Sequence, residues 1–195
     1  MNSIEAIRTR ASIKKFTDQP VSKDLIEQCL DVAVWAPNHR MTEPWRFCVL
    51  IEESRDRLIE IIASQLKSAG HHESHFVNQL VTSLTNSVET DRLKNKIKSS
   101  PVLIVVYSLP GNNPVVTKEN FAASCAAIQN LLLAAHHFGL GTIWRTAEYY
   151  DGPKVKEFLG IPEQAEFAGA IHMGYSNQSQ TERKRTSYAK VTNWL

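Results

Sequence analysis

Local catalytic motifs are scarce in this sequence. None of the signatures GxGxxG, GxxxxGKS/T and GxSxG occurs in its 195 residues. Their absence argues against a Rossmann dinucleotide fold, a P-loop nucleotide site and an α/β-hydrolase nucleophile. Cysteine is also rare, since Cys29, Cys48 and Cys125 lie far apart and form no CxxC pair. Each lies in an apolar helix or strand pattern, so we expect buried free thiols in a reducing compartment.

A recognisable metal-binding motif is missing as well. Residues 71–75 read HHESH, which is not the HExxH zinc signature, and adjacent histidines on a helix diverge by about 100°. His136 and His137 stand at the end of an apolar helix pattern, where they would interact with the helix dipole or line a pocket. We therefore predict no metal site.

Positive and negative side chains are nearly equal in number. The net charge of +2 is too small to indicate a nucleic-acid partner, and 43% hydrophobic with 22% charged residues is typical of a globular protein. The first ten residues hold no apolar run, so we expect no secretory signal and a cytoplasmic location. One stretch, 121–138, is apolar on nearly every face, but Gln129 and Asn130 favour a buried helix over a membrane span.

Hydrophobic periodicity and turn residues predict a single domain of helices and strands over residues 1–195, organised around the helix at 121–138. Gly139 ends this helix, and a short strand follows at Thr142–Trp144. An uninterrupted apolar run at Pro101–Ser108 indicates a strand covered on both faces. The other predicted elements are helices capped by Ser3 and Ser22, strands at Trp45–Ile51 and Glu166–Gly174, and helices at about Glu53–Ala69, Glu73–Lys98 and Pro153–Leu159.

Two segments lie outside this predicted core. Residues 53–100 form a helical excursion whose second half is polar for its length, so it either covers a ligand site or has a plain packing role. Residues 175–195 are polar and irregular, yet they end in Trp194 and Leu195, which have no apolar partner in their own segment. We therefore expect this tail to be an arm that reaches another subunit.

Two short basic clusters are candidates for binding an anion. Arg10, Ser12 and Lys14 occupy alternate positions, so in an extended segment they project to one side and offer a site for phosphate. From the spacing alone, a solvated charged edge is the commoner explanation. The second cluster, Arg183–Arg185, is by composition an ordinary exposed basic stretch, and it gains significance if it converges with the first.

A polar loop at Asn38–Trp45 is the third candidate. It precedes a buried strand, which is where the ligand-binding loops of many α/β folds gather. His39, Arg40, Thr42 and Glu43 offer donors and acceptors, although a lone loop histidine is more often a bystander than a catalyst.

Five motifs in the order found here resemble those of the nitroreductase family of FMN-dependent oxidoreductases, and they span almost the whole chain. The triplet Trp144-Arg145-Thr146 resembles the branch of short members that has W-R-S/T at this point. The motifs are R-x-S-x-R/K-x-F at Arg10–Phe16, A-P followed by P-W-x-F at Ala36–Phe47, A-x-x-N-L-L-L-A-A at Ala127–Ala135, G-L-G-T-x-W at Gly139–Trp144, and a G-Y pair at Gly174–Tyr175 before the basic Arg183–Arg185.

The resemblance implies an α+β sandwich around a central mixed sheet flanked by helices, in an obligate homodimer with exchanged C-terminal arms and two FMN sites at the interface. It implies that Arg10, Ala11 and Ser12 surround the FMN phosphate and ribityl end, with Arg183 or Arg185 completing that site. Lys14 would lie near the pyrimidine ring. The remaining implied cofactor contacts are Trp144, Arg145 and Thr146 along the isoalloxazine, and Asn38, His39 and Glu43 approaching the flavin of the other subunit.

Two departures bear on these roles. Glu43 stands where many members have glutamine, and this carboxylate would disfavour a reduced anionic ring, whereas Lys14 would stabilise it. Ala11 replaces a commoner basic residue, which would weaken phosphate binding slightly. Neither removes the site.

The implied activity is transfer of electrons from NAD(P)H through FMN to a nitroaromatic, a quinone or a similar small acceptor by a ping-pong mechanism. No catalytic protein side chain and no metal would be needed. Three alternatives stay open: a reductive dehalogenase or enal reductase on the same scaffold, a flavin-binding sensor or storage protein without turnover, and a flavin-free module that binds an acidic partner or nucleic acid through its basic clusters.

Overall fold

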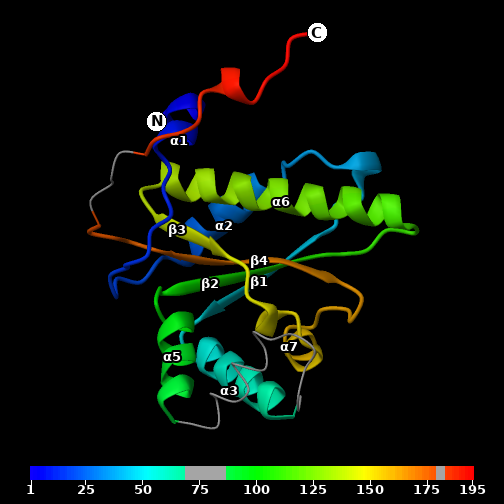
Figure 1. Cartoon of the computed structure of the whole chain (residues 1–195). Coiled ribbons are helices and arrows are strands. Elements are labelled where there is room, and N and C mark those ends of the chain that lie inside the picture. Colours follow the sequence, from blue (N-terminus) through cyan, green and yellow to red (C-terminus); the bar gives the residue numbers. More distant parts are fainter. Residues whose placement is uncertain (69–86, 179–182) are drawn as a thin grey trace.

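The computed structural model describes residues 1–68, 87–178 and 183–195 (Figure 1). Its central element is α6, Pro114–His137, which begins seven residues before the helix predicted at 121–138 and ends one residue earlier than predicted. Asn113 caps it by accepting the Val116 N–H at 3.0 Å, and Pro114 has the fixed φ that suits a first helical position. Gly139, at φ 79°, ends the helix as predicted.

Over the described residues, the sheet has four strands in the order β1-β2-β4-β3. They are β1 (Trp45–Ile51), β2 (Val102–Ser108), β3 (Gly141–Arg145) and β4 (Glu166–Gly174), close to the predicted ranges. Every strand pair is antiparallel, whereas we expected a mixed sheet. The parallel component within the described residues is a single bridge between Ser12 and Thr142.

The burial of β2 explains why its sequence did not reveal that the sheet is antiparallel. All seven of its residues are buried, because helices cover both faces of the sheet. A continuous apolar run is the usual pattern of parallel strands, but any strand covered on both faces produces it. The run therefore predicts the covering correctly and leaves the strand direction open.

Two helical layers enclose this sheet (Figure 1). On one face lie α6 and α2 (Lys23–Ala33), with Ile104, Ile128 and Leu131 in the core between them and the sheet. On the other lie α3 (Glu53–Ser68), α5 (Ser87–Ile97) and α7 (Pro153–Phe158). The excursion predicted at 53–100 thus supplies part of the second layer through α3 and α5, and its stretch 69–86 lies outside the described residues.

The N-terminal helix and the C-terminal tail lie side by side, beyond the end of α6 (Figure 1). Helix α1 (Ser3–Thr9) is capped by Asn2, whose Oδ1 accepts the Glu5 N–H at 2.9 Å, and not by Ser3 as we predicted. A turn of 3-10 helix, η3 (Tyr188–Lys190), interrupts the otherwise irregular tail. Over the described residues, no helix combines the length and apolarity needed to cross a membrane.

The cysteines are free thiols, as predicted, but only Cys29 is fully buried, while Cys48 and Cys125 are half-buried. Burial raises the pKa of Cys29 and of Cys48 to about 11, so neither is a thiolate at neutral pH. These two thiols are accordingly poor nucleophiles and belong to the packing of the molecule.

Candidate functional site

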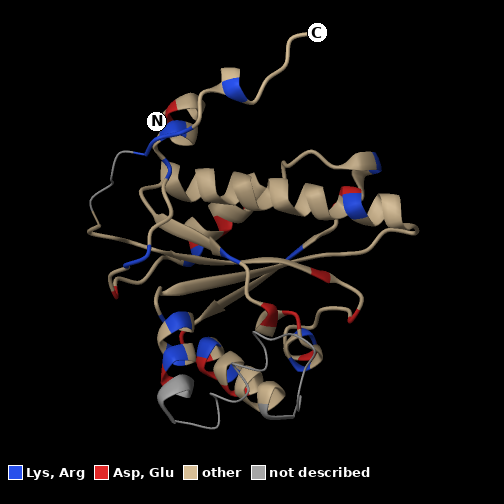
Figure 2. Ribbon diagram, in the orientation of Figure 1, with Lys and Arg blue, Asp and Glu red and all other residues tan. Residues whose placement is uncertain are grey.

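The two basic clusters predicted from the sequence converge in space. Arg10 follows the last residue of α1, and Arg183 of the tail donates a hydrogen bond from Nη2 to the carbonyl oxygen of Arg8 at 3.1 Å. Burial lowers the pKa of Arg10, and the charges of Arg183 and Arg185 lower it further. Figure 2 shows this gathering of basic residues where the chain leaves α1 and the tail passes it.

Three like charges held together are unfavourable unless an anion balances them. In the described ranges, none of the three arginines takes part in an ion pair with a carboxylate. An arginine fork is well suited to binding phosphate bidentately. The cluster is therefore a candidate anion site, because a plain solvated edge does not account for this convergence.

The segment that follows Arg10 lies along the edge of the sheet. The Ile13 N–H donates to the Thr142 carbonyl oxygen at 2.9 Å, and Ile13 itself is buried. Because side chains alternate in an extended segment, Ser12 and Lys14 are turned outward, and both are exposed. Gly141 permits this close approach, since a Cβ there would lie 2.9 Å from the Ile13 side chain.

A cleft of about 240 Å³ opens beside the cluster. Two hydrogen bonds join the opposite wall of the cleft to the segment that follows Arg10. The Lys14 N–H donates to Gln178 Oε1 at 3.3 Å, and the Ser176 hydroxyl donates to the Lys15 carbonyl oxygen. The lining residues are Met1, Arg10, Ala11, Ile13, His136, Gly139, Leu140, Gly141, Thr142, Ser176 and Gln178. The sequence identified Arg10 and Ala11 for this place, whereas for His136 it left open a helix-dipole role or a pocket-lining role and did not connect it with the phosphate site.

Strand β3 carries the predicted residues Trp144 and Arg145, with Thr146 directly after it. The Trp144 indole N–H donates to the Ala168 carbonyl oxygen at 3.1 Å, so the ring is turned into the core beside α6. Gly169 leaves the space for it, because a Cβ there would lie 2.0 Å from Trp144 Nε1. Trp144 can therefore contact a ligand only through part of its ring edge and its backbone, whereas Thr146 is exposed.

The loop with Asn38, His39 and Glu43 lies at the other end of α6. Its short 3-10 helix, η1 (His39–Met41), is held by a 2.7 Å contact between His39 Nδ1 and Glu119 Oε2. Asn38 Oδ1 accepts the Glu43 N–H at 3.1 Å. Three non-glycine residues of this loop have positive φ: Arg40 (54°), Met41 (55°) and Glu43 (42°). Such strain persists only where the surroundings impose it, and it clusters at functional sites.

One chain does not bring this loop to the cationic cleft. Its anchor Glu119 and the cleft residue His136 are 17 positions apart on α6, which corresponds to about 26 Å along a helix axis. The predicted site residues thus form two groups at opposite ends of one helix. A site that uses both groups requires two copies of the chain.

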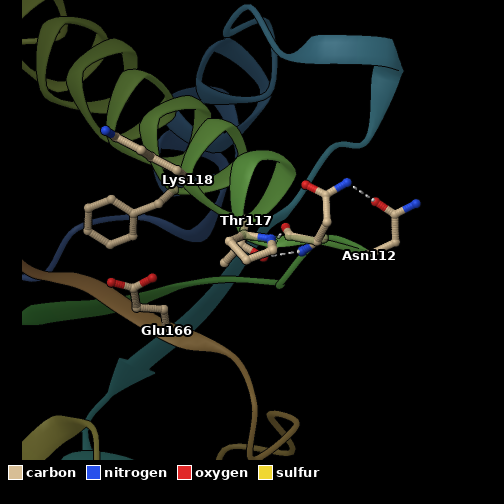
Figure 3. A pocket seen from close by; sticks show the side chains of 8 residues that line it. Asn112, Thr117, Lys118 and Glu166 are labelled. Atoms are coloured by element: carbon tan, nitrogen blue, oxygen red, sulfur yellow. Dashed lines mark hydrogen bonds between the residues drawn. The ribbon is translucent and has the colours of Figure 1, made fainter.

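A larger hollow of about 580 Å³ opens at the start of α6. Figure 3 shows Lys118 of α6 and Glu166 of β4 on opposite sides of it, and no ion pair joins them. Its loop wall is ordered by hydrogen bonds, including one from the Gly111 N–H to the Thr117 hydroxyl at 3.0 Å. One cation and one carboxylate balance in charge, so this hollow is a poorer phosphate site than the smaller cleft, despite its size.

No metal centre is present in the parts of the chain that the structure describes, which hold no group of three or more His, Cys, Asp or Glu side chains placed to bind an ion. The HHESH stretch at 71–75 lies outside them.

An antiparallel sheet lies between two helical layers, and a cleft beside three arginines opens at one end of the central helix, which defines an α+β protein with a candidate anion-binding site. The chain belongs to the nitroreductase family, which matches residues 7–175. It is 31% identical over 183 residues to YfhC of Bacillus subtilis, named as an NAD(P)H nitroreductase, covering 93% of this chain and 88% of that protein. It is 29% identical over 199 residues to an iodotyrosine deiodinase of Drosophila melanogaster, covering 96% and 68%.

Two solved structures extend the comparison. A nitroreductase-like family protein from Bacillus cereus superposes with a TM-score of 0.84 at 28% identity, covering 100% of this chain and 96% of that one. A nitroreductase from Desulfovibrio desulfuricans, solved in complex with FMN, superposes with a TM-score of 0.69 at 26% identity, covering 98% and 96%.

Proposed function

We propose that this protein is an FMN-dependent oxidoreductase that uses NAD(P)H. The observation that carries the proposal is the cluster of Arg10, Arg183 and Arg185 at the mouth of a cleft, with no carboxylate paired to any of them in the described ranges. The phosphate of FMN supplies the missing negative charge. The family relationship, and the FMN in the Desulfovibrio desulfuricans relative, support this choice of anion.

The residues along β3 fit the rest of such a cofactor. Ser12 and Lys14 are exposed beside Gly141–Arg145, where a hydroxyl and an ammonium group are available to a ligand that lies along the sheet edge. Lys14 would stabilise negative charge on the pyrimidine part of the ring, and the β3 backbone would line its flat face. Bound FMN supplies the redox chemistry, taking a hydride from NAD(P)H and passing electrons to a nitroaromatic, a quinone or a similar small acceptor in ping-pong order.

A second copy of the chain completes the site in this proposal. The strained loop with Asn38, His39 and Glu43 is about 26 Å from the cleft along α6, so it reaches the cofactor only across a dimer interface. Large apolar side chains exposed on the single chain support a homodimer: Ile4, Ile7, Trp35, Tyr188, Val191 and Trp194. The tail that carries Trp194 leaves the body beyond α1, as expected for an arm that embraces a partner (Figure 1).

Glu43 would act against Lys14 in this arrangement. A carboxylate that faces the ring from the second subunit opposes accumulation of negative charge there, whereas the ammonium favours it. Both side chains are exposed in the single chain, so each is free to face a cofactor at the interface.

The absorbance spectrum of the purified protein tests the proposal first. Peaks of oxidised flavin, with FMN released by heat at about one per chain, are expected. The double variant Arg10→Ala/Lys14→Ala should remain a folded dimer and lose its flavin. Lys94→Ala/Lys96→Ala is the matched control, because it removes two exposed cations from α5 on the other face of the sheet.

A protein that stays colourless and takes up no added FMN would overturn the proposal, and binding that collapses with salt would then favour a flavin-free module. Steady NAD(P)H oxidation with a nitroaromatic or quinone separates an enzyme from a silent flavin carrier. Release of iodide from an iodinated tyrosine tests reductive dehalogenation, which the similarity to the iodotyrosine deiodinase brings into consideration.

A further inference from the structure

His136 belongs to the cationic cleft, although no motif marks it. It lies in the last turn of α6 and lines the cleft together with Arg10 and Ser176. Its side chain is half-buried there. The neighbouring His137 is exposed and does not line the cleft, so the two adjacent histidines have different surroundings.

Hydrogen bonding indicates which nitrogen of His136 is available. Nε2 lies 2.8 Å from the Thr9 hydroxyl oxygen, and the Thr9 hydroxyl donates its one hydrogen to the Glu5 carbonyl oxygen at 2.7 Å. With its hydrogen in that bond, the Thr9 hydroxyl accepts from Nε2–H of His136. A protonated ring carries a hydrogen on both nitrogens, so its Nδ1–H is available to a ligand, and no hydrogen bond joins Nδ1 to any residue that the structure describes.

The charges around the ring come from three elements. Burial lowers the pKa of His136, and Arg10 after α1 and Arg183 of the tail lower it further. Glu5 of α1 opposes them, as does the helix C-terminus on which the histidine stands. The remaining polar side chains on the cleft wall, Thr142, Ser176 and Gln178, are neutral. Without an anion in the cleft, the ring is accordingly neutral near pH 7.

We infer that His136 is a further ligand of the cofactor phosphate and that it binds the phosphate in its protonated form. The inference rests on the proposed function. A phosphate between Arg10, Arg183 and His136 balances the arginine charges, so the ring gains a proton at Nδ1 and donates that N–H to a phosphate oxygen. Ala11, in the same cleft, contributes no charge, which leaves His136 as the titratable cation of the site.

Proton linkage gives the size of the effect. Suppose that FMN binding raises the pKa of His136 by about one unit. The affinity for FMN is then about tenfold higher at a pH well below the pKa values of His136 in the free and bound protein than at a pH well above both. Riboflavin, which lacks the phosphate, should show no such dependence. The phosphate itself also titrates, at about pH 6, and it is present in every FMN measurement.

The test is NMR titration of the His136 imidazole in the apoprotein, with FMN and with riboflavin. A pKa raised by FMN and unchanged by riboflavin is expected. Dissociation constants for both flavins at pH 5.5 to 8 complete it, in the parent protein and in His136→Gln, whose amide can still donate to Thr9. His137→Gln is the matched control. The titration of the FMN phosphate is common to all three proteins and is subtracted first. After this subtraction, the parent protein and His137→Gln should bind FMN more tightly at low pH than His136→Gln does.

Equal pH profiles for FMN in the parent and His136→Gln, or a His136 pKa that FMN leaves unchanged, would overturn the inference while leaving the proposed function intact. Failure of the parent protein to bind FMN at any pH would overturn the proposed function instead. If His136→Gln does not fold, the NMR titration of the parent protein alone still decides.

Discussion

The Thr42 hydroxyl donates a hydrogen bond to Oδ1 of Asn120 over 2.9 Å, which fastens the strained loop to helix α6. Asn120 is buried on α6, and its Nδ2 donates in turn to the Leu109 carbonyl oxygen at 3.0 Å. One side chain thus links the loop, the helix and the end of β2. Together with the His39–Glu119 contact, it holds positive φ values that the loop residues would not otherwise keep.

Replacing Asn120 by alanine should therefore damage both stability and the loop. The change leaves the Thr42 hydroxyl and the Leu109 carbonyl without their partner, so we expect a loss of about 1–3 kcal/mol in the free energy of unfolding. Urea denaturation measures it, with Asn112→Ala, an exposed asparagine, as the control. A variant as stable as the parent protein would show that water replaces the amide and that the loop needs no such anchor.

The sequence predicted the sheet and helices well where a pattern reports burial directly. The apolar run of β2 and the alanine-rich body of α6 are examples, since both elements are covered on nearly all sides. Strand direction was not predictable, because the covering of both faces produces the same run in either direction. The cap of α1 was placed one residue late, since both Asn2 and Ser3 are good capping residues.

For the site, the alternation of Arg10, Ser12 and Lys14 was visible in the sequence, because it depends only on local backbone geometry. The approach of Arg183 to the same place depends on the path of the tail past α1, which no local pattern encodes. For a related reason, the sequence left His136 open between a helix-dipole role and a pocket-lining role. A histidine at a helix end has a sufficient local explanation in the helix dipole, and its second role appears only when α1 is packed beside it.

Arg183 and Arg185 should not contribute equally to phosphate binding. Arg183 is held by its bond to the Arg8 carbonyl oxygen and affects the pKa of Arg10 more strongly than Arg185 does. A fixed guanidinium loses less freedom on binding than a mobile one. We expect Arg183→Ala to lower FMN affinity on the order of tenfold to a hundredfold and Arg185→Ala to lower it less. Fluorescence titration with FMN gives both values, and a larger loss in Arg185→Ala would reverse the assignment.

Gly169 should be intolerant of a side chain, because the indole of Trp144 occupies the space a Cβ would need. Gly169→Ala forces the ring away from the Ala168 carbonyl oxygen, and overpacking of this kind costs about 1–3 kcal/mol of stability. The double variant Gly169→Ala/Trp144→Leu should recover part of that loss, since the smaller side chain relieves the clash. Thermal unfolding of the four proteins measures the coupling, and strictly additive effects would show that the two residues do not compete for this space.

Because of His172, the protein should lose stability as the pH falls. It is 1% exposed on β4, and burial, followed by the charges of Arg145 and Arg55, lowers its pKa to about 3. Both neighbouring hydroxyls already donate elsewhere, Ser99 to the Lys96 carbonyl oxygen and Ser100 to the Val102 carbonyl oxygen, so Nδ1–H of the neutral ring donates to them. The folded protein therefore keeps this histidine neutral.

The sign of the pH effect follows from these two states. The folded pKa lies below the unfolded value of about 6.5, so the unfolded chain binds the extra proton as the pH falls. Stability should decrease from about pH 6.5 toward pH 3, with a slope of up to about 1.4 kcal/mol per pH unit from this residue. His172→Gln should flatten the slope of unfolding free energy measured by urea denaturation between pH 7 and pH 4. His137→Gln, which changes an exposed histidine, should leave the slope unchanged. An identical slope in His172→Gln would mean that the buried ring takes up a proton without unfolding.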